Sequence, residues 1–325
     1  MVFVDILEEL VRAYPEREAF RYRDAESGEV RSVRFDRFLE DVSRAAAYWS
    51  EKQKSLSPEE PFRVGIAADN SYPYFVEYLG VIAAGGVFVP LNQSFGAARV
   101  LEFAAEIGIP YMMAGEAQLA DSEYAAELNA AYPTGRLLPL DRVFAESSKC
   151  EALENLYRGE EDDTILMLLS SGTSGRSKIV ELTNGNLCAY PAEVFNGLHA
   201  ERERGTLQHY ENLIILPFFH IGGVIPIMGE LARGNCLFIS NARQFLQDLS
   251  ARQFGKLIVA PAMMKRILER AEKNEKVAKT LDSVHEALCL GAAMSPVLIQ
   301  ALHARNIMPR TYYGLTETTG TVTYR

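Results

Sequence analysis

The sequence predicts an α/β protein in which largely parallel sheets are covered by helices. Short runs rich in β-branched and other apolar residues recur along the chain, and most of them are separated by amphipathic helical segments. The runs are apolar on both faces, and strands of this kind need helices on both sides of their sheet. The expected strands are 63–68, 86–90, 164–169, 212–217, 235–240, 256–260 and 286–291.

The segments between these runs carry helical and hairpin patterns. Apolar residues recur at helical spacing over 38–49, where Asp36 is a candidate N-cap, and again over 261–268, which begins with a proline. Near the start of the chain, residues 19–35 have the pattern of an antiparallel hairpin with its turn at 26–28. We therefore expect one antiparallel addition to a mainly parallel protein.

Length and charge exclude several classes of protein. The chain has 325 residues, with 33 Lys and Arg against 43 Asp and Glu, so its net charge is −10. About two domains are expected from this length, and a chain of this size buries enough surface to fold without a metal or a disulfide. The negative charge argues against nucleic acid and anionic membranes as partners, because these recruit clustered Lys and Arg.

Nothing in the sequence predicts a transmembrane segment or a signal peptide. Glycine and proline interrupt the two long uncharged stretches, 78–98 and 212–229, and charges interrupt the first residues of the chain. The four cysteines, Cys150, Cys188, Cys236 and Cys289, lack disulfide or zinc spacing. Reduced, partly buried thiols and a cytoplasmic location are the expectation.

The loop after the expected strand 164–169 has a composition suited to phosphate. Residues 170–178 read Ser-Ser-Gly-Thr-Ser-Gly-Arg-Ser-Lys. Small residues allow backbone N–H groups to face phosphate oxygens, the hydroxyls add donors, and Lys178 adds a positive charge. The spacing is not GxxxxGK[ST], which argues against a P-loop kinase. Taken alone, such a run is also typical of a flexible linker.

Read with four other segments, this loop resembles the phosphate-loop signature of the adenylate-forming enzymes, a superfamily of acyl-CoA synthetases, peptide-synthetase adenylation domains and luciferases. The family pattern is roughly [ST]SGT[ST]GxPKG, followed by a hydroxyl residue and often His. Here Ser177, Ile179 and Asn184 replace its Pro, Gly and His. The other segments, in family order, are YLGVIAAGGVFVPLN (78–92), LPFFHIGGV (216–224), LGAAMSP (290–296) and TYYGLTETTG (311–320).

The resemblance implies a fold and a division of the chain. It implies two packed αβα subdomains, a five-layer αβαβα arrangement, with residues 55–200 forming the first and residues 1–54 plus 201–325 forming the second. The family continues past the YGxTE motif into an Asp that binds ribose, a hinge and a mobile C-terminal domain with a Lys. We therefore expect this chain to be a truncated N-terminal portion with little complete turnover by itself.

The resemblance also implies which residues hold ATP. Thr316 matches the hydroxyl on the α-phosphate, and Glu317 matches the magnesium ligand. An acid in the first turn of a helix is the alternative for Glu317. The residues implied at the β- and γ-phosphates are Thr173, Ser174, Gly175 and Lys178, with Ser170 at the entry of the loop. Those implied at the adenine are Gly291, Ala292, Ala293 and Tyr313, and Tyr312 is also implied to bind the nucleotide.

His220 matches the family histidine at the junction of the acyl pocket and the thiol path. By itself, a histidine in an apolar run is usually a hydrogen-bonded core residue. The resemblance implies positioning and gating by His220, together with the catalytic residues Lys178, Thr316 and Glu317. A buried core residue is the alternative for Tyr313.

The implied function is ATP- and Mg²⁺-dependent activation of a carboxylic acid to an acyl-adenylate, with transfer to CoA or a carrier-protein thiol in the full-length parent. The histidine in 216–224 favours acyl or aryl acids. Amino-acid activation is usually indicated by an Asp in the segment after that motif, where it binds the substrate ammonium, and residues 234–246 contain no acid. Two alternatives stay open: a fragment of an amino-acid adenylation domain, and a non-catalytic binding or scaffold protein. The changes around Lys178 motivate the second.

Overall fold

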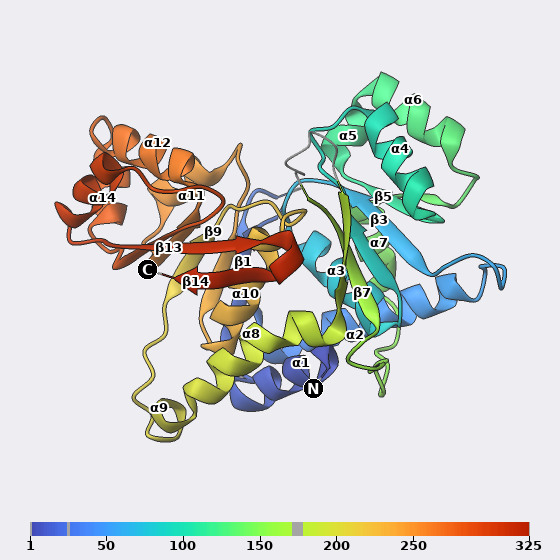
Figure 1. Ribbon diagram of the computed structural model, residues 1–325, viewed down its shortest axis with the longest axis horizontal. Coiled ribbons are helices and arrows are strands. Elements are labelled where there is room, and N and C mark those ends of the chain that lie inside the picture. The colour runs from blue at the N-terminus through green and yellow to red at the C-terminus, as the bar shows by residue number, and fades with distance from the viewer. Residues whose placement is uncertain (1, 25–26, 171–177, 325) are drawn as a thin grey trace. The chain divides into compact units, whose positions relative to one another are not determined.

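The computed structural model describes residues 2–24, 27–170 and 178–324, and it confirms the α/β class. Two compact units divide the chain. Unit 1 comprises residues 1–12 and 36–188, and unit 2 comprises residues 13–35 and 189–325. Each unit contains a mainly parallel sheet (Figure 1).

Unit 1 contains a six-stranded sheet in the order β6-β5-β3-β4-β7-β8. All neighbouring strands are parallel except β7 and β8, which are antiparallel. The strands are β3 (Arg63–Ala67), β4 (Val87–Pro90), β5 (Tyr111–Ala114), β6 (Leu137–Pro139), β7 (Thr164–Ser170) and β8 (Lys178–Thr183). The helices are α1 (Phe3–Ala13), α2 (Phe35–Gln53), α3 (Tyr72–Ala83), α4 (Ala97–Ile107), α5 (Glu116–Ala120), α6 (Ser122–Ala131) and α7 (Leu140–Ser147), and α8 (Asn184–Gly197) starts here.

Unit 2 contains an eight-stranded sheet in the order β14-β13-β12-β11-β9-β10-β1-β2. Its six central strands are parallel, and β14 and β2 add antiparallel pairs at the two edges. The strands are β1 (Glu18–Arg23), β2 (Val30–Arg34), β9 (Glu211–Ile214), β10 (Cys236–Ile239), β11 (Lys256–Val259), β12 (Glu286–Cys289), β13 (Met308–Leu315) and β14 (Gly320–Tyr324). The helices are α9 (His199–Glu203), α10 (Ile221–Ala232), α11 (Phe245–Ala251), α12 (Pro261–Ala271), α13 (Glu275–Leu281) and α14 (Pro296–His303).

The structure confirms the hairpin expected at 19–35, as the antiparallel strands β1 and β2. The predicted turn position Glu26 lies outside the described residues. Asp36 is not the N-cap of the following helix, because α2 begins at Phe35 and Asp36 is its second residue. Since the Phe35 N–H already bonds to the carbonyl of Arg17 (2.9 Å), the helix starts directly from the end of the hairpin.

Helix α2 belongs to unit 1, whereas the predicted division grouped residues 1–54 with 201–325. Two side-chain hydrogen bonds join it to α3. Tyr72 Oη donates to Asp41 Oδ2 (2.9 Å), and Trp49 Nε1 donates to Glu77 Oε2 (2.7 Å). All four side chains are buried. These bonds account for the placement of α2 with unit 1 and not with the hairpin that precedes it.

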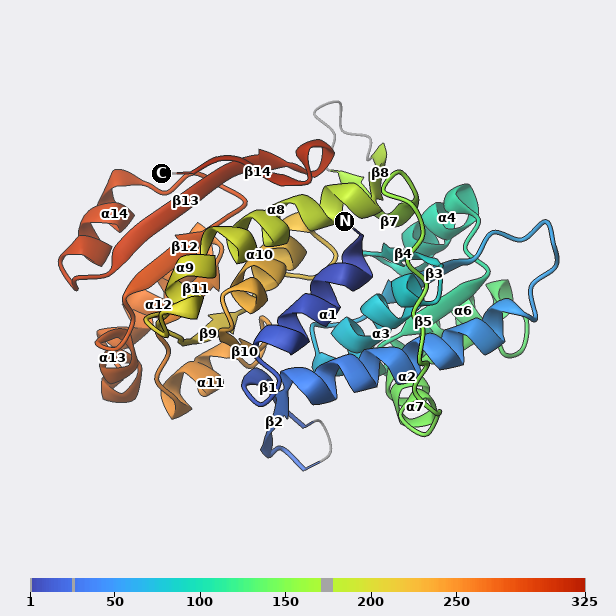
Figure 2. The same ribbon diagram turned by 90° about the horizontal axis from the view of Figure 1, so that it is seen from below.

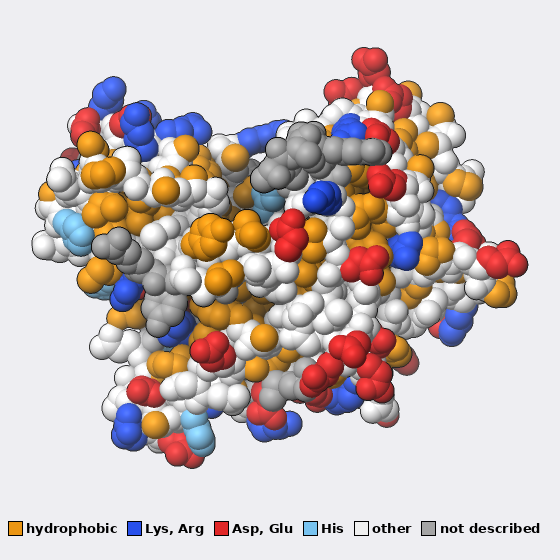
Figure 3. All heavy atoms as spheres, in the orientation of Figure 1, with side chains coloured by type: hydrophobic (Ala, Val, Ile, Leu, Met, Phe, Trp, Pro, Cys, Tyr) orange, Lys and Arg blue, Asp and Glu red, His pale blue; other side chains and the backbone are white. Residues whose placement is uncertain are grey.

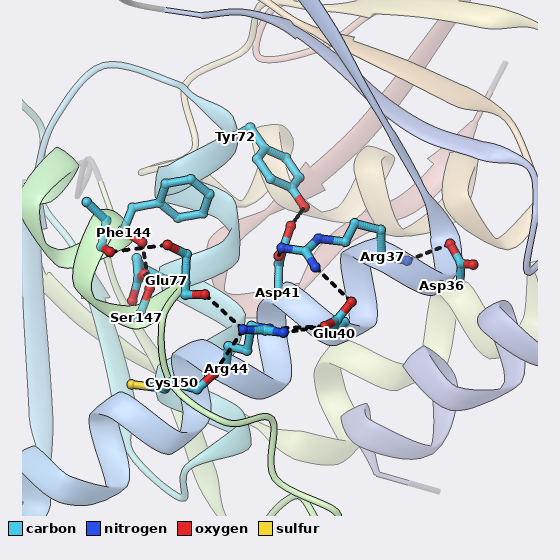
Figure 4. Close-up of polar contacts among 12 residues, drawn as sticks. Asp36, Arg37, Glu40, Asp41, Arg44, Tyr72, Glu77, Phe144, Ser147 and Cys150 are labelled. Atoms are coloured by element: carbon cyan, nitrogen blue, oxygen red, sulfur yellow. Dashed lines mark hydrogen bonds and ion pairs between the residues drawn. The ribbon is translucent and has the colours of Figure 1, made fainter.

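Glu77 is an acid in the interior of unit 1 (Figure 4). Besides the Trp49 bond, Ser147 Oγ donates to its Oε1 (2.6 Å). Burial disfavours the charged carboxylate and raises the pKa of Glu77 to about 7, although the hydrogen bonds from Ser147 and Trp49 act in the opposite direction. The protonated acid therefore links α2, α3 and α7.

On the face shown in Figure 3, the charged side chains are mixed in sign, with Lys and Arg side chains among Asp and Glu side chains. Within the described part of the chain, no helix is long and apolar enough to cross a membrane.

We expect Glu77→Gln to remove a pH-dependent loss of stability. The folded protein holds the Glu77 proton up to about pH 7, whereas the unfolded chain releases it near the ordinary value of 4.5. Stability is therefore lost as pH rises between these values, by on the order of 3 kcal/mol for a shift of this size. The Gln side chain can accept a hydrogen bond from Trp49 Nε1 and donate one to Ser147 Oγ, and it carries no charge at any pH.

Urea denaturation at pH 4 and pH 8 measures this effect, because pH 4 lies below the ordinary value of 4.5 and pH 8 lies above the raised value. The variant should match the wild type at pH 4 and exceed its unfolding free energy at pH 8. The comparison of two proteins at each pH removes the contribution of all other titrating groups. An equal difference at both pH values would contradict the account of Glu77.

Candidate active site

In unit 1, the candidate phosphate loop connects two antiparallel strands. Strand β7 is almost wholly buried and ends at Ser170, which pairs with Lys178 at the start of β8. The predicted phosphate-binding residues Thr173, Ser174 and Gly175 lie outside the described part of the chain. Ser170 is buried and its Oγ lacks a partner among the described residues, while Lys178 is exposed. An unsatisfied hydroxyl and an exposed ammonium thus flank the loop.

Asn184, which replaces the family histidine, has a structural role in unit 1. It is buried, its Oδ1 accepts from the N–H of Phe3 (2.7 Å), and its Nδ2 donates to the carbonyl of Arg158 (2.8 Å). The first bond satisfies a backbone donor in the first turn of α1, which has no partner within the helix. The sequence alone does not indicate this role, because the hydrogen-bond partners of Asn184 lie 181 and 26 positions away along the chain.

In unit 2, the matched segments follow parallel strands that end at the same edge of the sheet. His220 comes after β9, residues 291–293 come after β12, and residues 316–317 come after β13. Strands β9, β11, β12 and β13 are successive parallel neighbours. Such an edge is where ligands commonly bind in open α/β sheets. The fold therefore brings these three segments to one side of unit 2.

His220 lies at the N-terminus of α10, in an exposed position. The centroid of its imidazole ring lies 4.4 Å from the centroid of the Phe219 ring. A tight turn presents it: the His220 N–H bonds to the carbonyl of Pro217 (3.1 Å), and the Gly223 N–H bonds to the carbonyl of His220 (2.8 Å). A Cβ on Gly223 would lie 2.1 Å from the Pro217 oxygen, so this turn requires glycine.

The remaining candidate residues surround the ends of β12 and β13. Gly291 has φ +86°, and Ala292 and Ala293 are exposed beside it. Tyr313 is 64% exposed and so is not a core residue. Tyr312 is partly buried and precedes it in β13, so the two rings point to opposite faces of the sheet.

Thr316 and Glu317 lie in a short 3₁₀ turn, residues Thr316–Thr318. Thr318 Oγ1 accepts from the N–H of Leu315 (3.0 Å) and holds this turn. Glu317 is exposed, and the described residues contain no cluster of three His, Cys, Asp or Glu that could hold a metal. One carboxylate is compatible with Mg²⁺, which is usually bound by one or two carboxylates together with substrate phosphates.

A comparison with known proteins identifies the family. The profile described as AMP-binding enzyme matches residues 7–325. The chain therefore belongs to the AMP-binding enzyme family, as the motifs predicted.

Curated relatives are CoA ligases. "4-coumarate--CoA ligase-like 1" of Arabidopsis thaliana is 23% identical over 301 residues, which are 85% of this chain and 52% of the relative. "Feruloyl-CoA synthase" of an Amycolatopsis species is 25% identical over 281 residues, 85% of this chain and 54% of the relative. The chain thus spans about half the length of these relatives.

Solved structures share the fold. The N-terminal domain of FACL13 from Mycobacterium tuberculosis has a TM-score of 0.79 at 18% identity, covering 100% of this chain and 78% of that one. O-succinylbenzoate CoA synthetase from Bacillus subtilis, in complex with AMP, has a TM-score of 0.73 at 19% identity, covering 98% and 75%. The fold is thus that of the N-terminal domains of adenylate-forming enzymes.

Substitution of Asn184 by Ala should destabilise unit 1 by about 2 kcal/mol, because a buried N–H and a buried carbonyl lose their partners. Urea denaturation measures the change. Asn129→Ala is the control, since Asn129 is exposed on the same unit and its change should stay within about 0.5 kcal/mol. Equal effects of the two substitutions would show that the Asn184 bonds are not needed.

Gly223→Ala should disrupt the turn that presents His220. The added methyl group meets the Pro217 carbonyl oxygen, so we expect a loss of about 1–3 kcal/mol, as for other overpacked sites. Gly222→Ala is a matched control in the same helix turn, because a Cβ there meets no atom within 4 Å. Thermal unfolding of the two variants gives the comparison, and a stable Gly223 variant would contradict the geometry.

Proposed function

We propose that the chain carries the ATP and carboxylic-acid sites of an enzyme that activates an acid as its acyl-adenylate for transfer to CoA. One observation supports this most directly. His220, residues 291–293 and the turn at 316–317 follow parallel strands and so meet at one edge of the unit 2 sheet. Because the chain spans about half the length of its curated relatives, the activity of the whole protein is part of the proposal.

In the proposed reaction, a carboxylate oxygen attacks the α-phosphorus of ATP. A new C–O–P linkage forms, the bond to the bridging oxygen breaks, and pyrophosphate leaves with that electron pair. Negative charge on the phosphoryl oxygens requires positioned donors and cations, which are the main source of catalysis in such transfers. Mg²⁺, when bound, supplies charge neutralisation at the phosphates.

The chain's own residues have separate tasks in this proposal. Lys178 neutralises the outer phosphates, and the hydroxyl of Ser170 and the loop after it donate hydrogen bonds. Thr316 positions the α-phosphate, and Glu317 holds the metal ion. Exposed Tyr313 offers a ring face to the adenine, beside the small residues 291–293. His220 orients the acid at the start of α10.

The proposed substrates are a fatty or aryl acid, ATP, and CoA or a carrier-protein thiol. The names of the relatives, which include coumarate and feruloyl ligases, favour an aryl or acyl acid over an amino acid. Magnesium dependence and a cytoplasmic location complete the proposal, the latter supported by four free cysteines. Pyrophosphate exchange across fatty, aryl and amino acids tests the substrate class.

A non-catalytic binding protein is the second candidate. It is favoured by Asn184, whose side chain is held by Phe3 and Arg158 and so is not free for a ligand. Such a protein would bind Mg-ATP without exchanging pyrophosphate for any acid in the panel.

Isothermal titration with Mg-ATP tests the site itself. Lys178→Ala should weaken binding at least tenfold, because it removes a positive charge from the triphosphate. Lys149→Ala, which removes an exposed lysine elsewhere on unit 1, should leave binding unchanged. Glu317→Gln should abolish the gain in affinity that Mg²⁺ confers, whereas Glu272→Gln should not. Unaltered Mg-ATP binding by both Lys178 and Glu317 variants would refute the proposed site.

A further inference from the structure

The two residues proposed to bind the α-phosphate and the metal ion, Thr316 and Glu317, lie in the short loop 316–319 at the end of the β13–β14 hairpin. The last strand pair before this loop is Leu315 with Gly320. Glu317 is exposed, so packing does not hold its side chain. Its position therefore depends on what fixes the backbone of the loop.

The hydroxyl of Thr318 connects the loop to both strands. Its Oγ1 accepts a hydrogen bond from the Leu315 N–H (3.0 Å) and lies 3.1 Å from the carbonyl oxygens of both Leu315 and Gly320. A hydroxyl has one proton and two acceptor lone pairs, so Thr318 accepts from the N–H and at the same time donates to one of the two carbonyls. Because Leu315 and Gly320 face each other across the ladder, this one side chain closes the end of the hairpin.

The residue after Thr318 has a strained backbone. Thr319 has φ +55° and ψ +37°, in the left-handed region that a β-branched residue rarely adopts. Asn306 is the other non-glycine residue with a positive φ in the described part of the chain, and Asn tolerates this region better than Thr. Backbone strain persists only where the surrounding structure holds it, and it is concentrated at functional sites. Here the Thr318 bonds hold it, together with the bond from the Thr319 N–H to the Thr316 carbonyl (3.0 Å).

Helix α10 fixes the base of the loop. Strand β14, drawn in red in Figures 1 and 2, contacts this helix. A Cβ added to Gly320 would lie 3.4 Å from Cγ1 of Ile225, which is a buried residue of α10. Helix α10 begins directly after His220. The base of the loop is therefore fixed to the helix that presents the proposed acid-binding histidine, and Thr318 holds the tip.

We propose that Thr318 is a positioning residue for Glu317: its hydroxyl holds the loop 316–319 in the conformation in which the Glu317 carboxylate binds Mg²⁺ on the triphosphate. A loop that is already ordered loses less conformational entropy when its partner binds. The inference rests on the proposed function, which assigns the metal ion to Glu317. The role of Thr318 is to hold the loop, not to bind ATP or the metal ion.

Two substitutions of Thr318 test this role by isothermal titration of the full chain with ATP, with and without Mg²⁺. Thr318→Val keeps the branched shape and removes the hydroxyl, so it should reduce the affinity gain from Mg²⁺ at least fivefold and leave the affinity for Mg²⁺-free ATP within twofold. Thr318→Ser keeps the hydroxyl and should retain most of the gain. Thr323→Val is the control, because Thr323 is exposed on the same hairpin and its hydroxyl has no hydrogen-bond partner among the described residues.

Three results would overturn the positioning role. They are an unchanged Mg²⁺ gain in Thr318→Val, an equal loss of affinity with and without Mg²⁺, and an equal loss of the gain in Thr318→Ser. The second result would show that the hydroxyl supports the whole nucleotide site and not the metal ligand in particular.

Hydrogen exchange of the ligand-free chain tests the loop without any metal. The Leu315 N–H donates to Thr318 Oγ1, so it should exchange at least tenfold faster in Thr318→Val than in the wild type and in Thr318→Ser. The Leu290 N–H, which donates to the Val259 carbonyl (3.1 Å), should keep its rate and so show that unit 2 stays folded. An unchanged rate at Leu315 would overturn the proposal.

Glu317→Gln separates this proposal from the proposed function. If Glu317→Gln loses the Mg²⁺ gain while Thr318→Val keeps it, the proposed metal ligand stands and the positioning role fails. If the wild-type chain shows no Mg²⁺ gain, the assignment of the metal ion to Glu317 fails and the positioning role fails with it. Loss of the gain in both variants, with rescue by Thr318→Ser, supports both.

Discussion

The parallel direction of the central strands is the constraint on which the candidate active-site segments of unit 2 depend. The six central strands, in sheet order β1, β10, β9, β11, β12 and β13, all run in the same direction. Every loop that follows one of these strands therefore lies at one edge of the sheet, and every loop that precedes one lies at the other edge. Segments far apart in the chain, such as those at His220 and Glu317, are brought to a common edge by this rule alone. The adenylate-forming motifs lie at one edge, and the ion pairs of Lys256 with Glu230 and Glu286 lie at the other.

Buried polar groups are concentrated where elements must hold a specific arrangement. Glu77 joins three helices of unit 1 through two hydrogen bonds, and Asn184 joins the first turn of α1 to the carbonyl of Arg158. In unit 2, Lys256 lies between two carboxylates at the start of the strands. Hydrophobic burial is not directional, so it cannot select one helix orientation as these bonds do. The polar contacts therefore supply geometry more than stability.

Hydrophobic pattern accounts for the parts of the fold that the sequence predicted. The central strands were expected because they are apolar on both faces, and α2 and α12 because their apolar residues recur at helical spacing. Strands β13 and β14 were not expected as a hairpin, since residues such as Arg310 and Thr311 give no alternating apolar signal, and Leu315 is exposed. The same limit applies to Asp36, where a local pattern could not show that the hairpin leads straight into the helix.

For the candidate site, the motifs predicted which segments matter, and the strand order explains why three of them meet. The polar cluster at the other edge carries no sequence signal, because Asn212, Lys256 and Glu286 are adjacent only through strand register. Glu230 is visible in the sequence as an exception, because it is the lone acid in an otherwise apolar helix. A buried acid of this kind needs a cation, but its partner can be named only from the fold.

The discontinuous make-up of the units has a consequence for synthesis on the ribosome. Strand β1 pairs in parallel with β10, whose residues are translated more than 200 positions later. Helix α1 likewise meets Asn184 only after 181 further residues. Contacts this distant in sequence slow folding, and exposed strand edges favour aggregation. Until β10 is translated, β1 can pair only with β2 of its own hairpin. Most of unit 1 is translated during that interval.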